Sequence, residues 1–207
     1  LLPVLDDAMN RLSVAKTMSV KSRAGTDLHI KTEGAPTRGG VGFLRDEDMV
    51  AYWPAGLVLC FPLENSVDGT LVLNAGDVNL TFKKYVDSPV TMHIEKDNVV
   101  AIEGTGRDAV MLRSYYEAWN DPNAYNVSHV GWGLNPAASW ESLTMYDKND
   151  INGTELRAIA GSFLFSTGAN EFANRLTNCH FDFPMRHCDV LVDDVPVVED
   201  GHLAPLK

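Results

Sequence analysis

Residues 179–183 (Cys-His-Phe-Asp-Phe) alternate strictly between apolar and polar side chains, which constrains the fold more than any other segment. Successive side chains of a β-strand point to opposite faces, so the alternation predicts a strand with one buried face. Phe181 would face the core, while His180 and Asp182 would project together from the other face. Burying an imidazole and a carboxylate is unfavourable without a partner. A metal ion would satisfy both groups, although a mutual hydrogen bond is the commoner arrangement for an isolated His-x-Asp.

The same strand pattern recurs in short segments, and two helical segments interrupt it. Apolar residues at helical spacing predict helices over residues 5–17 and 108–119. Strands are expected at 18–22, 26–32, around Val58, and at 70–73, 90–94 and 98–103. A strand–loop–strand region, with strands at 159–165 and 179–192, is expected to close the chain. Loops or turns are expected at 39–40, 45–48 and 67–69, the last from an Asp-Gly pair. These elements predict an α+β domain with mainly antiparallel strands and two or three helices.

The composition limits the kinds of partner and compartment. The 207-residue chain has a net charge of −11, which argues against nucleic acid and anionic membranes, because both recruit Lys and Arg. No apolar run approaches the roughly 18 residues of a membrane span. Three cysteines without framework spacing fit a reducing, cytoplasmic compartment. The chain opens with Leu1 in amphipathic sequence, so we expect residues 1–207 to be one metal-binding catalytic domain of a longer protein whose N-terminal α/β domain is absent.

A third candidate ligand, His129, precedes a segment rich in glycine and ending in Asn135-Pro136. Such sequence is typical of tightly specified backbone, and we expect His129 at the start of a loop. With His180 and Asp182 it would complete two histidines and one carboxylate, the ligand set of facial-triad Fe(II) oxygenases. Three protein ligands leave positions open for a chelating substrate and O₂. Catalytic zinc sites can use the same ligand set, so zinc remains an alternative.

Several motifs resemble the aminopeptidase T family of metallopeptidases over most of the chain. They are Gly-Thr-Asp-Leu at 25–28, the turn at 65–70, Gly-Leu-Asn-Pro at 133–136 and the closing His-x-Asp. That family binds two metals with two Glu, two His and one Asp. Here the two Glu positions read Leu57 and His129, and the strand that supplies a His reads Gly-Ser-Phe-Leu, ending at Leu164. Only His180 and Asp182 are retained, so the resemblance implies the aminopeptidase T-like C-terminal fold with a single metal.

This departure from the peptidases is similar to that of the 2,5-dihydroxypyridine 5,6-dioxygenase family, which shares the fold and uses mononuclear Fe(II). The resemblance implies Fe(II) held by His129, His180 and Asp182. It also implies ring cleavage of a dihydroxypyridine, 2,5-dihydroxypyridine to N-formylmaleamate, in nicotinate catabolism, with both atoms of O₂ incorporated. The expected partners are a small N-heteroaromatic substrate and O₂, in a homo-oligomer.

Leu57 and Leu164, where the peptidases carry ligands, and Ser166 are expected to contact the substrate. His187, seven residues after His180, is a candidate for contact with a ligand or for proton transfer. One alternative is a zinc-dependent aminopeptidase, which would need a general base near the metal and lacks both glutamates. Another is a non-enzymatic oligomerisation domain with a degenerate metal site.

Overall fold

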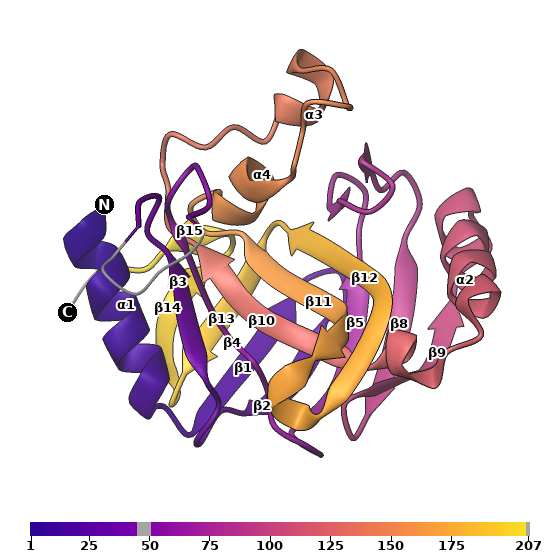
Figure 1. Ribbon diagram of the computed structural model, residues 1–207, viewed down its shortest axis with the longest axis horizontal. Helices are drawn as coiled ribbons and strands as arrows, with labels where there is room; N and C mark the ends of the chain where they lie inside the picture. Colours follow the sequence, from indigo (N-terminus) through magenta and orange to yellow (C-terminus); the bar gives the residue numbers. More distant parts are fainter. Residues whose placement is uncertain (45–50, 206–207) are drawn as a thin grey trace.

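Two antiparallel sheets make up most of the protein and pack against each other in the computed structural model, which describes residues 1–44 and 51–205 (Figure 1). The larger sheet contains, in spatial order, β15 (His202–Leu203), β14 (Val195–Glu199), β13 (Cys188–Val192), β1 (Thr17–Ser22), β2 (Asp27–Lys31), β5 (Val67–Leu73), β8 (Val90–Glu95) and β9 (Asn98–Glu103). The smaller sheet contains β12 (Arg175–Met185), β11 (Phe163–Asn170), β10 (Val127–Gly133), β4 (Leu57–Cys60) and β3 (Thr37–Gly40). A further pair joins β6 (Val78–Asn79) to β7 (Lys84–Tyr85).

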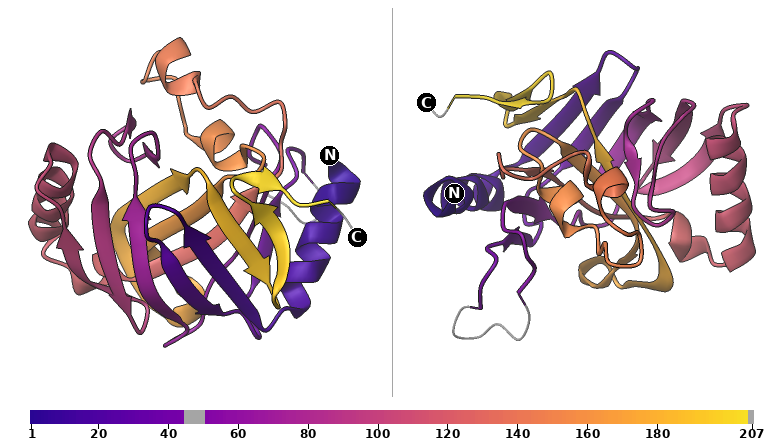
Figure 2. Two further views of the ribbon diagram at one scale, coloured as in Figure 1. Left: turned by 180° about the vertical axis from the view of Figure 1, so that it is seen from behind. Right: turned by 90° about the horizontal axis from the view of Figure 1, so that it is seen from above.

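The helices lie at the ends of this two-sheet body. They are α1 (Leu2–Val14), α2 (Arg107–Trp119), α3 (Ser142–Met145), α4 (Thr154–Ala158) and the 3-10 turns η1 (Pro122–Tyr125) and η2 (Glu171–Ala173). Helix α1 contacts β3 and β4, and α2 lies at the opposite end beside β9 (Figures 1 and 2). The connection from β10 to β11 carries α3 and α4 over one end of the smaller sheet. No helix among the described residues is long and apolar enough to cross a membrane.

One apolar core lies between the sheets. On β12, Phe181 and Phe183 are fully buried, and they pack in the same cluster as Val20 and Leu28 of the larger sheet. Burying a side chain of this size contributes roughly 1.5–3 kcal/mol, so the alternation along the strands fixes which face of each sheet points inward. The smaller sheet therefore has a second face, directed away from the core, on which its polar side chains gather.

The structure confirms the predicted α+β fold with mainly antiparallel strands. Both expected helices are present, as α1 and α2, and the short α3 and α4 raise the count among the described residues to four. Residues 39–40 were expected in a loop but lie in β3, where Gly39 leaves room for Met9 of α1. A Cβ at Gly39 would lie 2.3 Å from the Met9 sulfur, so this glycine serves helix packing.

The turn expected at 67–69 is also wrong, because these residues begin β5. Gly69 has a φ of +130°, and a Cβ there would lie 2.2 Å from the carbonyl oxygen of Asp27. The Asp-Gly pair thus marks a close approach between β5 and β2 rather than a hairpin. The strand expected at 159–165 begins later, at Phe163. The loop expected at 45–48 lies outside the described residues.

Candidate metal centre

His129 lies in the middle of strand β10 rather than at the start of a loop. The pairing of β10 with β11 shifts between Val127, opposite Thr167, and Val130, opposite Phe165. Ser128 and His129 therefore both stand against one residue of β11, which is a β-bulge. Bulges redirect side chains and are frequent beside active sites. Next to the fully buried Val130, His129 points away from the core, and the bulge brings Ser128 beside it.

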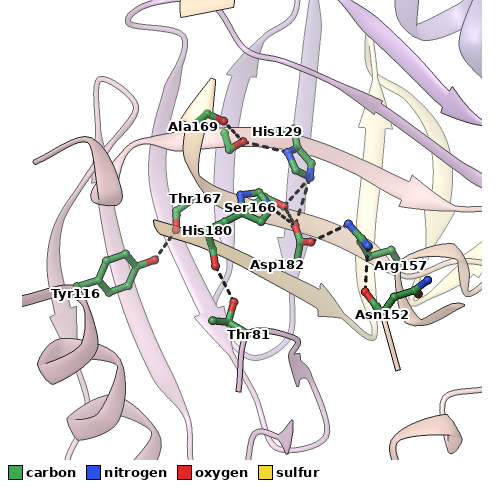
Figure 3. Close-up of polar contacts among 11 residues, drawn as sticks. Thr81, Tyr116, His129, Asn152, Arg157, Ser166, Thr167, Ala169, His180 and Asp182 are labelled. Carbon is green, nitrogen blue, oxygen red and sulfur yellow. Dashed lines mark hydrogen bonds and ion pairs between the residues drawn. The ribbon is translucent and has the colours of Figure 1, made fainter. Parts of the chain in front are cut away.

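His180 and Asp182 project from the same face of β12, as the alternation predicted. Phe181 between them points into the core. Strand β11 lies between β12 and β10, and its Ser166 pairs with Asp182. Three neighbouring strands thus each contribute a polar side chain to one face of the smaller sheet (Figure 3).

The three candidate ligands converge on one point. Their possible ligand atoms all lie within 4.8 Å of one another. Oδ1 of Asp182 is 3.3 Å from Nε2 of His129 and 3.2 Å from Nε2 of His180. Two donors at about 2.1 Å from a metal and at right angles to each other would be roughly 3 Å apart. The two separations from Asp182 therefore fit neighbouring ligands of an octahedral ion, and all three donor pairs lie within 4.8 Å.

The electrostatics of the site favour an ionised carboxylate. Burial opposes ionisation of Asp182, but hydrogen bonds from His129 and His180 outweigh it and hold the pKa of this carboxyl well below its usual range. Burial lowers the pKa of His129, an effect that the neighbouring Asp182 partly offsets. Arg157 of α4 adds a positive charge, with Nη1 3.0 Å from Oδ2 of Asp182. An anionic carboxylate and a neutral imidazole are the forms that bind divalent metals.

A cavity of about 400 Å³ opens beside His129. Its walls are largely apolar, and the lining includes Arg38, Val41, Phe43, Tyr52, Pro54, Leu57, Leu59, Phe61, Thr154 and Arg157. The ring centroids of Phe61 and His129 are 5.5 Å apart. The cavity therefore combines flat apolar surfaces with access to one candidate ligand.

The residues expected to contact the substrate occupy different places. Leu57 lines the cavity. Leu164 is fully buried on the same face of the sheet, between Gly131 and Pro184, and is not part of the cavity lining. Ser166 is also fully buried and hydrogen-bonds the candidate ligands themselves.

His187 does not join the cluster. It follows the end of β12, and its 64% exposed side chain lies 4.0 Å from Asp200. The strand runs roughly 10 Å from Asp182 to its last residue, Met185, at about 3.3 Å per residue, and His187 lies beyond that end, away from the ligands. The expectation of proton transfer by His187 is therefore not supported by its position.

Two residues that contact the ligands escaped the sequence analysis. Arg157 reaches Asp182 from a segment without a clear sequence pattern, and no local signal could have identified it. Ser128 hydrogen-bonds Nδ1 of His129 at 3.1 Å. The adjacency of Ser128 and His129 in the sequence was visible, but a regular strand would have directed them to opposite faces.

Comparison with known proteins identifies relatives of both the sequence and the fold. The profile of the family described as 2,5-dihydroxypyridine 5,6-dioxygenase matches residues 3–205. The curated 2,5-dihydroxypyridine 5,6-dioxygenase of Pseudomonas putida KT2440 is 40% identical over 97% of this chain, which spans only 59% of that protein.

Two solved structures extend the comparison. The 2,5-dihydroxypyridine dioxygenase of Pseudomonas putida KT2440 superposes with a TM-score of 0.93 at 38% identity, covering 98% of this chain and 59% of that one. AmpT from Thermus thermophilus superposes with a TM-score of 0.70 at 17% identity, covering 98% of this chain and 54% of that one. The likeness to AmpT shows a shared fold, as the sequence motifs suggested.

Proposed function

This chain belongs to the 2,5-dihydroxypyridine 5,6-dioxygenase family, and from that premise we propose that it carries the iron site of a ring-cleaving dioxygenase. The observation that carries the proposal is the convergence of His129, His180 and Asp182 within 4.8 Å. In the proposal, residues 1–207 act as one metal-binding catalytic domain, and the substrate is a dihydroxypyridine such as 2,5-dihydroxypyridine. The activity of the whole protein is part of the proposal, since the chain spans 59% of its curated relative.

The ligand set supports Fe(II) as the metal. Two imidazoles and one carboxylate on one face leave open positions, an arrangement typical of non-haem Fe(II) oxygenases. When bound, Fe(II) would supply the change of redox state that reaction with O₂ requires and that Zn²⁺ lacks. The role of the protein is to hold Nε2 of His129 and Nε2 of His180 within 3.3 Å of Oδ1 of Asp182, with His129 and Asp182 buried.

The cavity supports a flat aromatic substrate. Leu57, Leu59 and Phe61 form an apolar surface that excludes water and suits a planar ring better than a peptide. Arg157 lines the same cavity and places a guanidinium group beside Asp182. A ring oxygen that carries negative charge would be stabilised there by the positive charge.

The structure gives less support to a hydrolase. A single-metal aminopeptidase needs a general base beside the metal-bound water. Among the described residues, the cluster capable of holding a metal contains only His129, His180 and Asp182, and no carboxylate appears in the lining of the adjacent cavity.

The test is metal analysis of protein purified without oxygen, followed by O₂ uptake with 2,5-dihydroxypyridine. We expect O₂ consumption to require Fe(II), to stop on chelation and to resume with Fe(II) and a reductant, but not with Zn²⁺. A zinc-loaded protein that hydrolyses peptides and consumes no O₂ would overturn the proposal in favour of the aminopeptidase.

A further inference from the structure

We infer that Ser128 and Arg157 determine which atom of each buried ligand residue faces the metal. Ser128 selects Nε2 of His129, and Arg157 selects Oδ1 of Asp182. Both act through hydrogen bonds to the far side of the ligand, so they are positioning residues. The inference rests on the proposed metal site and extends it to residues that do not bind the metal.

The hydrogen bonds of Ser128 fix the orientation of the His129 ring. The Ser128 hydroxyl donates its only proton to the carbonyl oxygen of Ala169, which can only accept. The same oxygen lies 3.1 Å from Nδ1 of His129, so it must accept a hydrogen bond from an Nδ1–H group. Nδ1 is thereby occupied, so Nε2, which lies 3.3 Å from Oδ1 of Asp182 and 2.9 Å from the Ser166 hydroxyl, is the nitrogen that a metal would bind in place of a proton. The β-bulge makes this contact possible because it brings the two adjacent side chains together.

Arg157 occupies the other oxygen of the carboxylate. Its Nη1 lies 3.0 Å from Oδ2 of Asp182, whereas Oδ1 faces His129 and His180. An ion pair with Asp182, whose side chain is only 7% exposed, is screened little by water. With Oδ2 held by Arg157, Asp182 offers the metal one oxygen rather than two.

The two contacts together limit the number of donors. Three residues would supply three single donor atoms, which would leave the remaining positions of a bound metal for a chelating substrate and O₂. Binding of Asp182 through both oxygens would occupy one further position. A His129 ring turned by 180° about its Cβ–Cγ bond would lose its bond to Ser128 and place the carbon Cε1 where Nε2 now lies.

The first experiment measures Fe(II) affinity without oxygen, by competition with a chelator, in Ser128→Ala and Arg157→Gln. Each variant should bind Fe(II) roughly 10- to 100-fold more weakly, the usual effect of removing a hydrogen bond to a metal ligand. Ser128→Thr and Arg157→Lys retain a hydroxyl and a positive charge, so each should bind more tightly than its Ala or Gln counterpart. Thermal unfolding of the metal-free variants shows whether each remains folded.

Matched controls separate metal positioning from general destabilisation. Ser66 is a buried serine that also donates to a carbonyl, and Arg175 pairs with the buried Asp97 at 2.8 Å. Ser66→Ala and Arg175→Gln should lower the unfolding temperature but change Fe(II) affinity by less than about twofold, because they share no partner with the site. Unchanged affinity in folded Ser128→Ala and Arg157→Gln would overturn the inference.

The second experiment identifies the donor atoms directly. Long-range ¹H–¹⁵N spectra of Zn²⁺-loaded, ¹⁵N-labelled protein should show that His129 binds the metal only through Nε2 in the wild type. In Ser128→Ala they should show a mixture of molecules that bind through Nε2 and molecules that bind through Nδ1. In Co²⁺-loaded protein, the visible absorption should change in Arg157→Gln as the second oxygen of Asp182 enters the coordination. Exclusive Nε2 ligation in Ser128→Ala, or an unchanged Co²⁺ spectrum in Arg157→Gln, would contradict the respective assignment. A wild-type protein that binds none of these metals would instead refute the proposed function.

Discussion

The hydroxyl of Ser166 lies 2.9 Å from Nε2 of His129 and also donates a hydrogen bond to Asp182. One side chain of β11 therefore bridges candidate ligands from the strands on either side of it. The bridge places the fully buried Ser166 among the ligands and outside the lining of the adjacent cavity.

Ser166→Ala should therefore affect the site more than substrate binding. We expect the free energy of unfolding of the metal-free protein to fall by about 1–3 kcal/mol, because a buried carboxylate loses a hydrogen-bond donor. The KM for 2,5-dihydroxypyridine should change little once the protein is saturated with Fe(II). Denaturant unfolding and steady-state O₂ uptake measure the two effects. A large increase in KM with unaltered stability would return Ser166 to the role of substrate contact.

His180 and His187 provide a paired test of the ligand assignment. His180→Ala should weaken Fe(II) binding by more than the roughly 10- to 100-fold typical of a residue that only hydrogen-bonds a ligand. His187→Ala should leave metal content and O₂ uptake unchanged, because its side chain is 64% exposed and pairs with Asp200. Both are measured as iron per protein and as initial rates of O₂ consumption. Loss of turnover in a folded, iron-loaded His187→Ala protein would restore the proton-transfer role.

Local pattern was sufficient to predict the strand that carries His180 and Asp182, because alternation directly reports which face is buried. It could not predict that His129 lies in a strand with Ser128 beside it, since the segment is rich in glycine and the β-bulge depends on the pairing of β10 with β11. Gly39 and Gly69 were misread for a related reason. Both leave space for another part of the chain, Met9 and Asp27 respectively, and such space is indistinguishable from a turn signal in sequence alone.

Arg157 shows a second limit of the sequence. Its contact with Asp182 spans 25 positions and originates in the five-residue helix α4. Helices this short are stabilised by tertiary packing rather than by their own periodicity, so neither the helix nor its contact leaves a pattern. Resemblance to a family supplied the ligand set but not the residues that orient it.

Leu57 and Leu164 should respond differently to truncation. Leu164 is fully buried, so Leu164→Ala should lower the free energy of unfolding by about 2–5 kcal/mol. Leu57 is only partly buried and lines the cavity, so Leu57→Ala should destabilise less but raise the KM for the aromatic substrate. Denaturant unfolding of both proteins and O₂ uptake at varied substrate concentration separate the effects. The reverse pattern would show that Leu164, not Leu57, contacts the substrate.

Asp108, in the first turn of α2, gives a test of stability that is independent of the metal. Its Oδ1 lies 2.6 Å from Nζ of Lys84, and its Oδ2 accepts hydrogen bonds from the backbone amides of Asp87 and Ser88. Burial alone would raise the pKa of Asp108, but Lys84 and these amides lower it below its ordinary value. The ionised carboxylate is therefore more favourable in the folded protein than in the unfolded one.

The sign of the pH dependence follows from this shift. A carboxyl whose folded-state pKa is depressed contributes stability above its unfolded pKa of about 3.9 and loses that contribution as the pH falls toward the folded value. Asp108→Asn should thus lower the free energy of unfolding by about 1–3 kcal/mol between pH 5 and 8, and the difference from wild type should shrink below about pH 4. Urea unfolding of both proteins at a series of pH values measures this difference in the free energy of unfolding. Asp7→Asn is the control, because its ion pair with Arg11 is exposed and 3.9 Å long and should contribute less than about 1 kcal/mol. A difference for Asp108→Asn that persists undiminished at pH 3 would show that the ionised carboxylate is not what joins α2 to Lys84.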